Sequence, residues 1–184
     1  MLALTPVEYM MFRILRLLRK LPVNILGVGN SKVIFADYFK GFENVSAVQG
    51  IFGEKTSEVL GNLVVELSWV GGYMYVDGSD GHLVISKGYL NTGDKKEIYL
   101  DLIHELCHVK QFLDGKELFD PRYDYVDRPT EIEAYRYTVE EAMRIGFTYE
   151  QILRYLQTEW ISDEDLNRLV ENMGINFKTQ RALG

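Results

Sequence analysis

His104-Glu105-Leu106-Cys107-His108 places two of the chain's three histidines four residues apart, with a glutamate directly after the first. Residues four apart on a helix lie on one face, so the two imidazoles can hold a single tetrahedral Zn²⁺. Glu105 points partly to the side of this face, where it reaches a water at the open fourth position and can act as its general base. This HExxH pattern predicts one zinc ion per chain, with His104 and His108 as ligands and Glu105 as the catalytic residue.

The segment 94–115 is predicted to be the helix that carries the pattern. Asp94, followed three residues later by Glu97, resembles a capping box, and Gly115 follows the last apolar turn as a stop signal. At about 100° per residue, the apolar side chains fall on one arc and the two histidines on the other. We therefore expect the histidines to face a cleft while the back of the helix packs in the core.

Three other residues of this helix have less certain roles. Asp101, one turn before the first histidine, is either an acceptor for an imidazole N–H or a solvated acid. Cys107 lies on the flank and is expected to be a small core residue rather than a ligand. Lys110 is the one residue that does not fit the two arcs.

The composition is that of an ordinary globular protein, and it excludes several classes. A chain of 184 residues with 47% hydrophobic and 26% charged residues fits one domain. The net charge of −7 argues against nucleic acid as a partner. A single cysteine excludes an internal disulfide framework and a multi-cysteine zinc site. No secretory signal or membrane-length apolar window is recognisable, so the expected location is the cytoplasm, without stable membrane insertion.

The order of elements predicts an α+β fold, in which a small antiparallel or mixed β-sheet precedes the HExxH helix and a further helix with a glutamate follows it. One domain, 1–184, is expected, with an N-terminal helix and sheet part at 1–93, a helical part at 94–174 and a tail at 175–184. The expected helices are 6–20, a short one at 54–61, 94–115, 128–145, 149–159 and 163–173. The expected strands are 31–36, 62–68, 71–77 and 81–87, the last two joined by a hairpin turn. The stretch 38–60 is otherwise ambiguous.

A catalytic zinc usually has three protein ligands, so a third has to be found. Asp114 stands where metzincins place theirs, but Gln111 replaces the glycine that their sharp turn needs. His82 is the remaining histidine, yet it follows Gly81 at the start of a strand and is expected to be exposed. The third source is Pro129-Thr130-Glu131-Ile132-Glu133-Ala134, which begins 21 residues after His108.

In residues 94–145 the chain resembles the gluzincins, HExxH metallopeptidases whose third ligand is a glutamate in an ExxA motif on a downstream helix. The resemblance implies a zincin-like fold, Glu131 as the third zinc ligand, and Ala134 as the small residue that lets the two helices approach. Tyr135 stands where some gluzincins have Asp or Asn, so the contact made by that side chain is not carried over.

The pattern of the second helix supports the same glutamate. Glu131 shares the more apolar face with Tyr135 and Ala142, and an acid on an inward face needs a partner, which zinc supplies. Asp127 or Thr130 is expected as the N-cap. Glu133 shares its face with charged residues and is expected to be solvated.

The predicted activity is peptide hydrolysis by a zinc-activated water, with a peptide or protein as substrate. The alternative is a catalytically weak or latent zinc-binding regulatory module of the same fold. A deformylase-like site would need an upstream cysteine, which the chain lacks. A donor to the oxyanion is expected, and four tyrosines are within sequence reach of the site, but the sequence does not rank them and none is assigned this role. The four are Tyr123, Tyr125, Tyr135 and Tyr137. The substrate is expected beside the strand 81–87 as an edge strand. The oligomeric state is not predicted.

Overall fold

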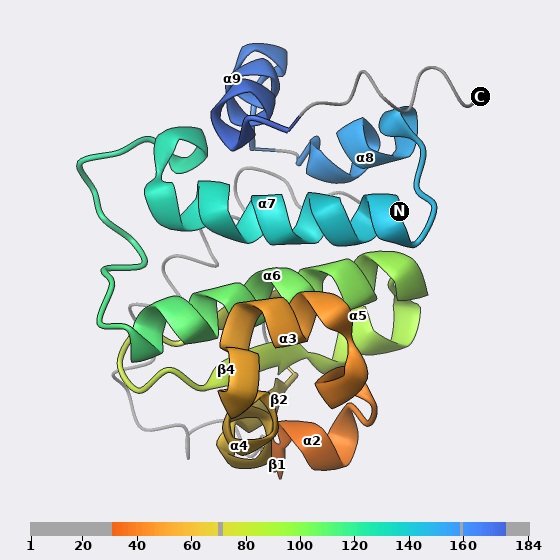
Figure 1. The fold of residues 1–184 in the computed structure, drawn as a ribbon, viewed down its shortest axis with the longest axis vertical. Coiled ribbons are helices and arrows are strands. Elements are labelled where there is room, and N and C mark those ends of the chain that lie inside the picture. The colour runs from red at the N-terminus through yellow and green to blue at the C-terminus, as the bar shows by residue number, and fades with distance from the viewer. Residues whose placement is uncertain (1–30, 70–71, 159, 176–184) are drawn as a thin grey trace.

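The computed structural model describes residues 31–69, 72–158 and 160–175. The helix predicted at 6–20 and nearly all of the tail predicted at 175–184 lie outside these residues. Within them, the chain has the expected α+β composition, with a small mixed sheet and a larger number of helices (Figure 1).

The sheet has four strands in the order β1-β2-β4-β3. Strand β2 pairs antiparallel with β1 and parallel with β4, and β4 pairs antiparallel with β3. All four predicted strands are present, each shorter than expected: β1 is Ser31–Ile34, β2 is Val64–Ser68, β3 is Met74–Val76 and β4 is Leu83–Ser86. The prediction that 81–87 is an edge strand is wrong, because β4 lies between β2 and β3. Among the described strands, β1 and β3 lie at the two edges.

The predicted hairpin turn joins β3 to β4. The N–H of Asp77 donates to the carbonyl of His82 at 2.8 Å, and the N–H of Gly81 donates to the carbonyl of Asp77 at 2.8 Å. Gly81 has a φ of +78°, which favours glycine, and a Cβ there would lie 2.3 Å from Cδ1 of Phe112. The turn therefore packs directly on the helix that carries the histidines.

In the first half of the chain there are more helices than predicted. In the second half the helices are the predicted ones. The long ones are α6, Lys95–Leu113, and α7, Pro129–Arg144, followed by α8, Tyr149–Leu156, and α9, Asp163–Met173. The short helix expected at 54–61 is α4, Thr56–Asn62. Three helices were not expected: α2, Phe35–Tyr38, α3, Ser46–Phe52, and α5, Lys87–Thr92.

Helix α6 begins and ends where its cap residues predict. The carboxylate of Asp94 accepts hydrogen bonds from the N–H groups of Lys96 and Glu97, at 2.8 and 3.1 Å. At the other end, Gly115 has a φ of +75°, and the next N–H, of Lys116, donates to the carbonyl of Gln111 at 2.9 Å. These contacts satisfy backbone groups that the helix itself leaves without partners.

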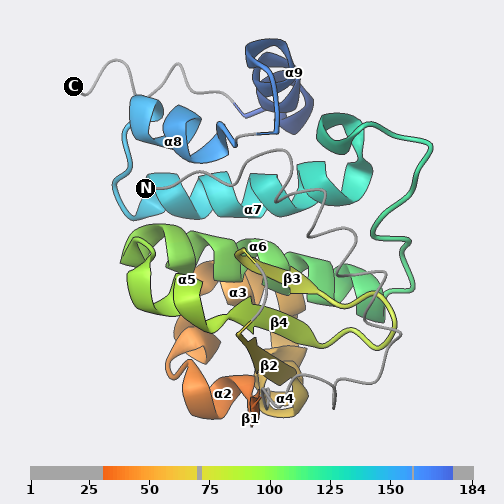
Figure 2. The ribbon, with the colours of Figure 1, turned by 180° about the vertical axis from the view of Figure 1, so that it is seen from behind.

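Helix α6 lies between the sheet and α7, so its two sides belong to two apolar clusters. Figures 1 and 2 show α6 and α7 side by side, with the sheet next to α6 and with α8 and α9 beyond α7. Most of the apolar residues of α6 pack with the sheet and with α3 and α4. Leu100 instead joins α7, α8 and α9 in the second cluster.

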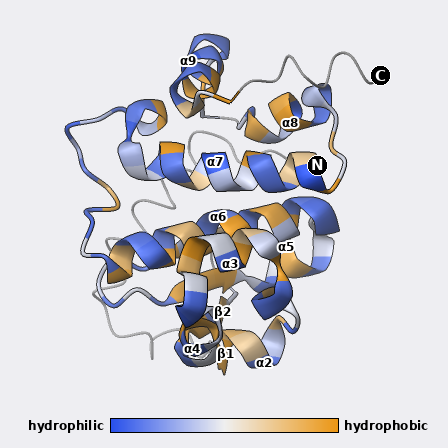
Figure 3. Cartoon of the chain, viewed as in Figure 1, coloured by the Kyte–Doolittle hydropathy of each residue, from blue (hydrophilic) through white to orange (hydrophobic). Residues whose placement is uncertain are grey.

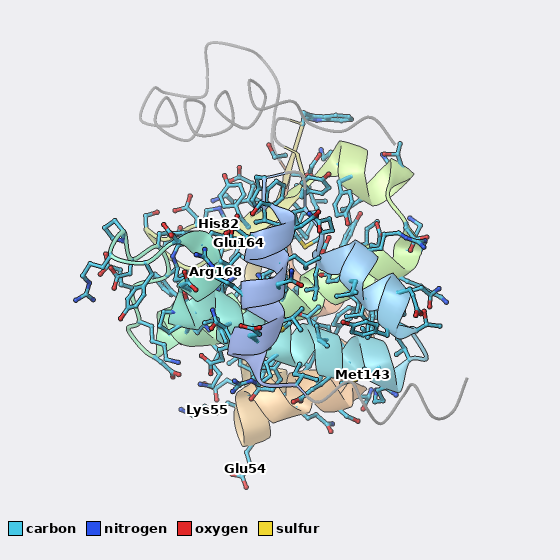
Figure 4. The ribbon with its side chains drawn as sticks, turned by 90° about the horizontal axis from the view of Figure 1, so that it is seen from above. Glu54, Lys55, His82, Met143, Glu164 and Arg168 are labelled. Atoms are coloured by element: carbon cyan, nitrogen blue, oxygen red, sulfur yellow. The ribbon has the colours of Figure 1, made fainter. Side chains whose placement is uncertain are left out.

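Polar side chains lie mainly on the outside of these layers. Figure 3 shows hydrophobic colours along the strands and along one side of the helices. The exposed Glu54 projects from the periphery in the view from above (Figure 4). Among the described helices, none combines the length and the apolar character needed to cross a membrane.

Candidate metal centre

Helices α6 and α7 bring three predicted ligands together. His104 and His108 come from α6 and Glu131 from the first turn of α7, and all three residues are buried. The Nε2 atoms of the two histidines lie 3.0 Å apart. The Oε2 atom of Glu131 lies 3.3 Å from Nε2 of His104 and 3.5 Å from Nε2 of His108. The three atoms thus form a small triangle.

The size of this triangle fits a tetrahedral metal ion. Zinc bonds of about 2.0 to 2.2 Å to nitrogen and oxygen imply ligand atoms roughly 3.3 to 3.5 Å apart along each edge of a tetrahedron. Two edges of the triangle have this length and the edge between the two imidazoles is slightly shorter. The three side chains therefore need only small rotations to coordinate one ion.

Gln111, on the same helix, determines which nitrogen of His108 faces the site. Its amide nitrogen donates to the carbonyl of Thr130 and to the carboxylate of Glu133, each at 2.9 Å. Its amide oxygen is thereby directed to Nδ1 of His108, at 2.7 Å. Because an amide oxygen only accepts, Nδ1 must carry the proton, and the lone pair of a neutral His108 lies on Nε2, in the triangle.

The prediction for Glu133 is wrong. It was expected to be a solvated surface residue, but its carboxylate accepts from the buried Gln111 and pairs with Lys116 at 2.7 Å. The polar chain from His108 through Gln111 to Glu133 therefore ends at a surface lysine. Sequence periodicity missed this role because Lys116 lies in the loop between the two helices.

The triangle needs a cation. A neutral His108 with its proton on Nδ1 would present the lone pair of Nε2 to the Glu131 carboxylate, whose Oε2 has no hydrogen-bond partner among the described residues. Although burial opposes the shift, the charge of Glu131 accordingly raises the pKa of His108 to about 9. Burial alone would raise the pKa of Glu131, but His108 and His104 hold it below its ordinary value. The carboxylate is therefore charged, and a proton or a metal ion between these atoms offsets their repulsion.

His104 is positioned by packing rather than by a second hydrogen bond. Its ring meets that of Tyr135 edge to face, with centroids 4.4 Å apart. Its Nδ1 has no hydrogen-bond partner in the described part of the chain. Asp101, considered in the sequence as an acceptor for this nitrogen, instead accepts from the hydroxyls of Tyr89 and Tyr155, at 2.5 and 2.7 Å. That alternative for Asp101 is wrong.

Glu105 lies beside the cluster and next to the edge strand β3. Its carboxylate receives a hydrogen bond from the backbone of Val76. Burial raises the pKa of Glu105 to about 8, and the charge of Glu131 adds to this effect while His108 opposes it. A carboxyl group with a pKa near neutrality is suited to take up and release a proton at physiological pH.

The four tyrosines considered as oxyanion donors lie at different distances from the cluster. Tyr125 and Tyr135 share a hydrogen bond of 2.7 Å between their hydroxyls, and Tyr135 packs against His104. Tyr137 donates to the carbonyl of Gly50 at 3.3 Å, and Tyr123 is exposed. Only the Tyr125 and Tyr135 pair lies at the cluster.

The other two candidates for the third ligand lie elsewhere. Asp114 is paired with Lys110 at 2.6 Å on the surface. His82 is not exposed as predicted, because its side chain is 11% accessible. It lies between Asp80, to which its Nδ1 is hydrogen-bonded, and Glu66, whose Oε2 lies 3.5 Å from its Nε2. Neither residue belongs to the cluster. The expectation for Cys107 as a core residue is confirmed, since it is fully buried and unpaired.

Arg128 is a residue of the site that the sequence did not indicate. It is the N-cap residue of α7, the position predicted for Asp127 or Thr130, and it makes no side-chain cap hydrogen bond. Its Nη1 lies 3.6 Å from Oε1 of Glu131, whereas the histidines lie near the other oxygen, Oε2. A positive charge thus adjoins the triangle.

Comparison with protein-family models, with curated protein sequences and with solved structures gave no significant match. The function of this site is therefore inferred from its own geometry and chemistry.

Proposed function

We propose that this protein is a zinc-dependent metallopeptidase with a zincin-like fold, related in its site to the gluzincins. The observation that supports the proposal most strongly is the convergence of the two Nε2 atoms and Oε2 of Glu131 within 3.5 Å of one another. Two imidazoles and one carboxylate leave one position of a tetrahedron open, which is typical of catalytic rather than structural zinc sites.

The donor set favours zinc over the harder cations. Calcium and magnesium prefer six or more oxygen ligands, whereas imidazole nitrogen suits zinc and its neighbours in the transition series. The ligand His108 also has the hydrogen-bonded Nδ1 that metal-binding histidines commonly show. We infer one zinc per chain, held by His104, His108 and Glu131.

A bound zinc ion would polarise a substrate carbonyl and make water more acidic. Within this chain, Glu105 is the group proposed to take the proton from the attacking water and to pass it to the leaving amine. The raised pKa of Glu105 supports its ability to do both. The hydroxyls of Tyr125 and Tyr135 are the nearest candidates for a donor to the developing oxyanion.

The edge strand β3 offers a place for an extended substrate. The residues that flank it, Tyr73 and Asp77, hydrogen-bond to Ser86 and His82, which leaves the backbone groups of Met74 and Val76 directed away from β4. Val76 already contacts Glu105. A peptide added along β3 would therefore pass directly beside the proposed base, so the substrate position expected at 81–87 moves to β3.

Glu105→Gln tests the proposal. The amide can still hydrogen-bond a water but cannot accept its proton, so we expect unchanged folding, one bound zinc, and a loss of peptide hydrolysis of about 10² to 10⁴ fold. Zinc content by mass spectrometry and cleavage of a diverse peptide library measure the two properties separately. A wild-type protein that binds zinc but cleaves no peptide would favour the latent regulatory module, and wild-type cleavage by the variant would exclude Glu105 as the base.

A further inference from the structure

Arg128 has more hydrogen-bonding capacity than its surroundings use. Its side chain is only 15% exposed, yet a guanidinium group carries five N–H donors. Its one ion pair in the described part of the chain is the contact of 3.6 Å with Oε1 of Glu131, which is too long for a hydrogen bond. Its Nε is buried and has no hydrogen-bond partner among the described residues.

The other charges around Arg128 do not supply the missing partner. Asp120, in the loop between α6 and α7, already forms an ion pair with Arg122. Nη2 of Arg122 lies 2.5 Å from Oδ2 of Asp120. Tyr125 offers only its ring, 6.0 Å from the guanidinium carbon. Once Glu131 shares its charge with a divalent ion, the acid that remains near Arg128 is Asp120, which is already paired with Arg122. A positive charge such as that of Arg128 is costly to bury without an anion.

The guanidinium group lies close to the reacting centre. The side chain of Arg128 keeps an exposed fraction of 15%, although its Nε is buried. Nη1 lies 3.6 Å from Oε1 of Glu131, and the other oxygen of the same carboxylate, Oε2, lies 3.3 Å from Nε2 of His104. In a peptide, the scissile carbonyl carbon and the carboxylate carbon of a C-terminal residue are three bonds apart, roughly 4 Å. A carboxylate on the residue next to the scissile bond therefore has the right reach.

We propose that Arg128 binds a substrate carboxylate on the residue beside the scissile bond, which makes the protein selective for peptides that are acidic at this position. The carboxylate is either the C-terminal group, which would make the enzyme a carboxypeptidase, or the side chain of Asp or Glu. Both would form the paired N–H to oxygen bonds that arginine makes with carboxylates. This inference rests on the proposed peptidase function only in taking the ligand that carries the carboxylate to be a peptide.

Affinity selection with a catalytically inactive protein tests the inference without turnover. The zinc-loaded Glu105→Gln protein is mixed with acetylated, randomised tetrapeptides, supplied in equal amounts as C-terminal acids and C-terminal amides, and the retained peptides are measured by mass spectrometry. We expect peptides with a suitable carboxylate to be retained about tenfold or more above the others, the range of hydrogen bonds to charged groups. Enrichment of the acids identifies the C-terminal carboxylate, and enrichment of Asp or Glu among the amides identifies a side chain.

Two double variants are then compared. Arg128→Gln is combined with Glu105→Gln in one protein, and Arg154→Gln is combined with Glu105→Gln in the matched control, because Arg154 is an exposed arginine on α8. The preference should disappear in the first and persist in the second, at equal zinc content. If Arg128→Gln loses zinc, Arg128→Lys keeps the charge beside Glu131 and should retain zinc with a reduced preference. Equal retention of all peptides, no retention of acidic peptides, or a preference that survives Arg128→Gln would overturn the inference. Hydrolysis by wild-type protein is measured separately, so a zinc protein that prefers carboxylates without cleaving them would contradict only the proposed function.

Discussion

The side chain of Gln111 shows how one buried amide can prepare a metal ligand. Its two donor contacts, to Thr130 and Glu133, fix the direction of its oxygen toward His108. Without them the amide could turn over and place a donor against Nδ1, which would favour the wrong tautomer. The orientation of the ligand thus depends on backbone and side chains of α7, a different helix from its own.

Gln111→Leu is expected to weaken zinc binding without removing a ligand. The leucine leaves Nδ1 of His108 without an acceptor, and the loss of such a contact typically lowers metal affinity by about 10 to 100 fold. Competition with a chromogenic chelator measures this change. Glu133→Gln is the control, because it removes a charge from the same chain of contacts and leaves the bond between Gln111 and His108 in place. Equal zinc affinity in Gln111→Leu and wild type would show that the tautomer is set elsewhere.

The two glutamates at the start of α7 provide a matched pair for ligand assignment. Glu131→Ala removes an atom of the triangle, so we expect loss of stoichiometric zinc at micromolar metal. Glu133→Ala removes an acceptor of Gln111 and the partner of Lys116 but no ligand atom, so it should keep one zinc per chain with at most the weaker binding of an indirect effect. Metal analysis after dialysis measures both. Zinc retained in Glu131→Ala but lost in Glu133→Ala would reverse the assignment.

At the scale of elements, the long helices were predictable because residues close to each end in the sequence determine where the helix begins and ends. Asp94 and the left-handed glycine Gly115 cap α6 as expected. The hydroxyl of Ser162 and the left-handed glycine Gly174 cap α9 in the same way. The short helices α3 and α5 lack a comparable length of periodic pattern, and packing against neighbours decides their conformation.

The order of the strands could not be read in the same way. Alternating residues predict a strand but not its neighbours, so β4 was taken for an edge although it lies inside the sheet. The same limit applies to the site. Spacing along one helix predicted His104 and His108, and the gluzincin resemblance, supported by the pattern of the second helix, predicted Glu131. The roles of Gln111 and Arg128 depend on distances across the fold.

The turn between β3 and β4 is expected to be sensitive to a single methyl group. Gly81→Ala places a Cβ at a φ of +78° and 2.3 Å from the ring of Phe112, so we expect a loss of about 2 kcal/mol or more in the free energy of unfolding. Gly61→Ala is the control within helix α4, where no heavy atom lies within 4 Å of the added carbon. It should be neutral or stabilising by up to about 1 kcal/mol. Urea denaturation of both variants provides the comparison, and equal effects would show that Phe112 moves aside without cost.

At the scale of the whole molecule, Asp101 joins parts of the chain that the sequence keeps far apart. It lies on α6 and accepts hydrogen bonds from Tyr89 of α5 and Tyr155 of α8. These contacts connect the side of the molecule that carries the sheet with the helices beyond α7. Burial raises the pKa of Asp101 to about 6, although the two hydroxyls oppose this shift.

The raised pKa gives the stability of the fold a defined dependence on pH. The folded state binds a proton at Asp101 more tightly than the unfolded state, whose pKa is near the ordinary value of 3.8. Folding is therefore favoured by this group below pH 4, and the benefit is lost as the pH rises to about 6, by at most about 3 kcal/mol at 1.36 kcal/mol per unit. Asp101→Asn removes the charge and keeps one oxygen acceptor for the tyrosines.

We expect the free energy of unfolding of Asp101→Asn, minus that of wild type, to increase between pH 4 and pH 7. Both proteins are denatured with urea in the presence of a chelator, so that the titration of the zinc ligands cancels in the difference. Asp114→Asn is the control, and its difference from wild type should stay nearly constant over this range. The bond from Lys110 lowers the pKa of Asp114 from 3.8, so its contribution to stability is lost only as the pH falls below about 4. A difference for Asp101→Asn that stays constant over this range, or decreases, would mean that the two tyrosines stabilise the charged carboxylate fully and that this connection between the helices is independent of pH.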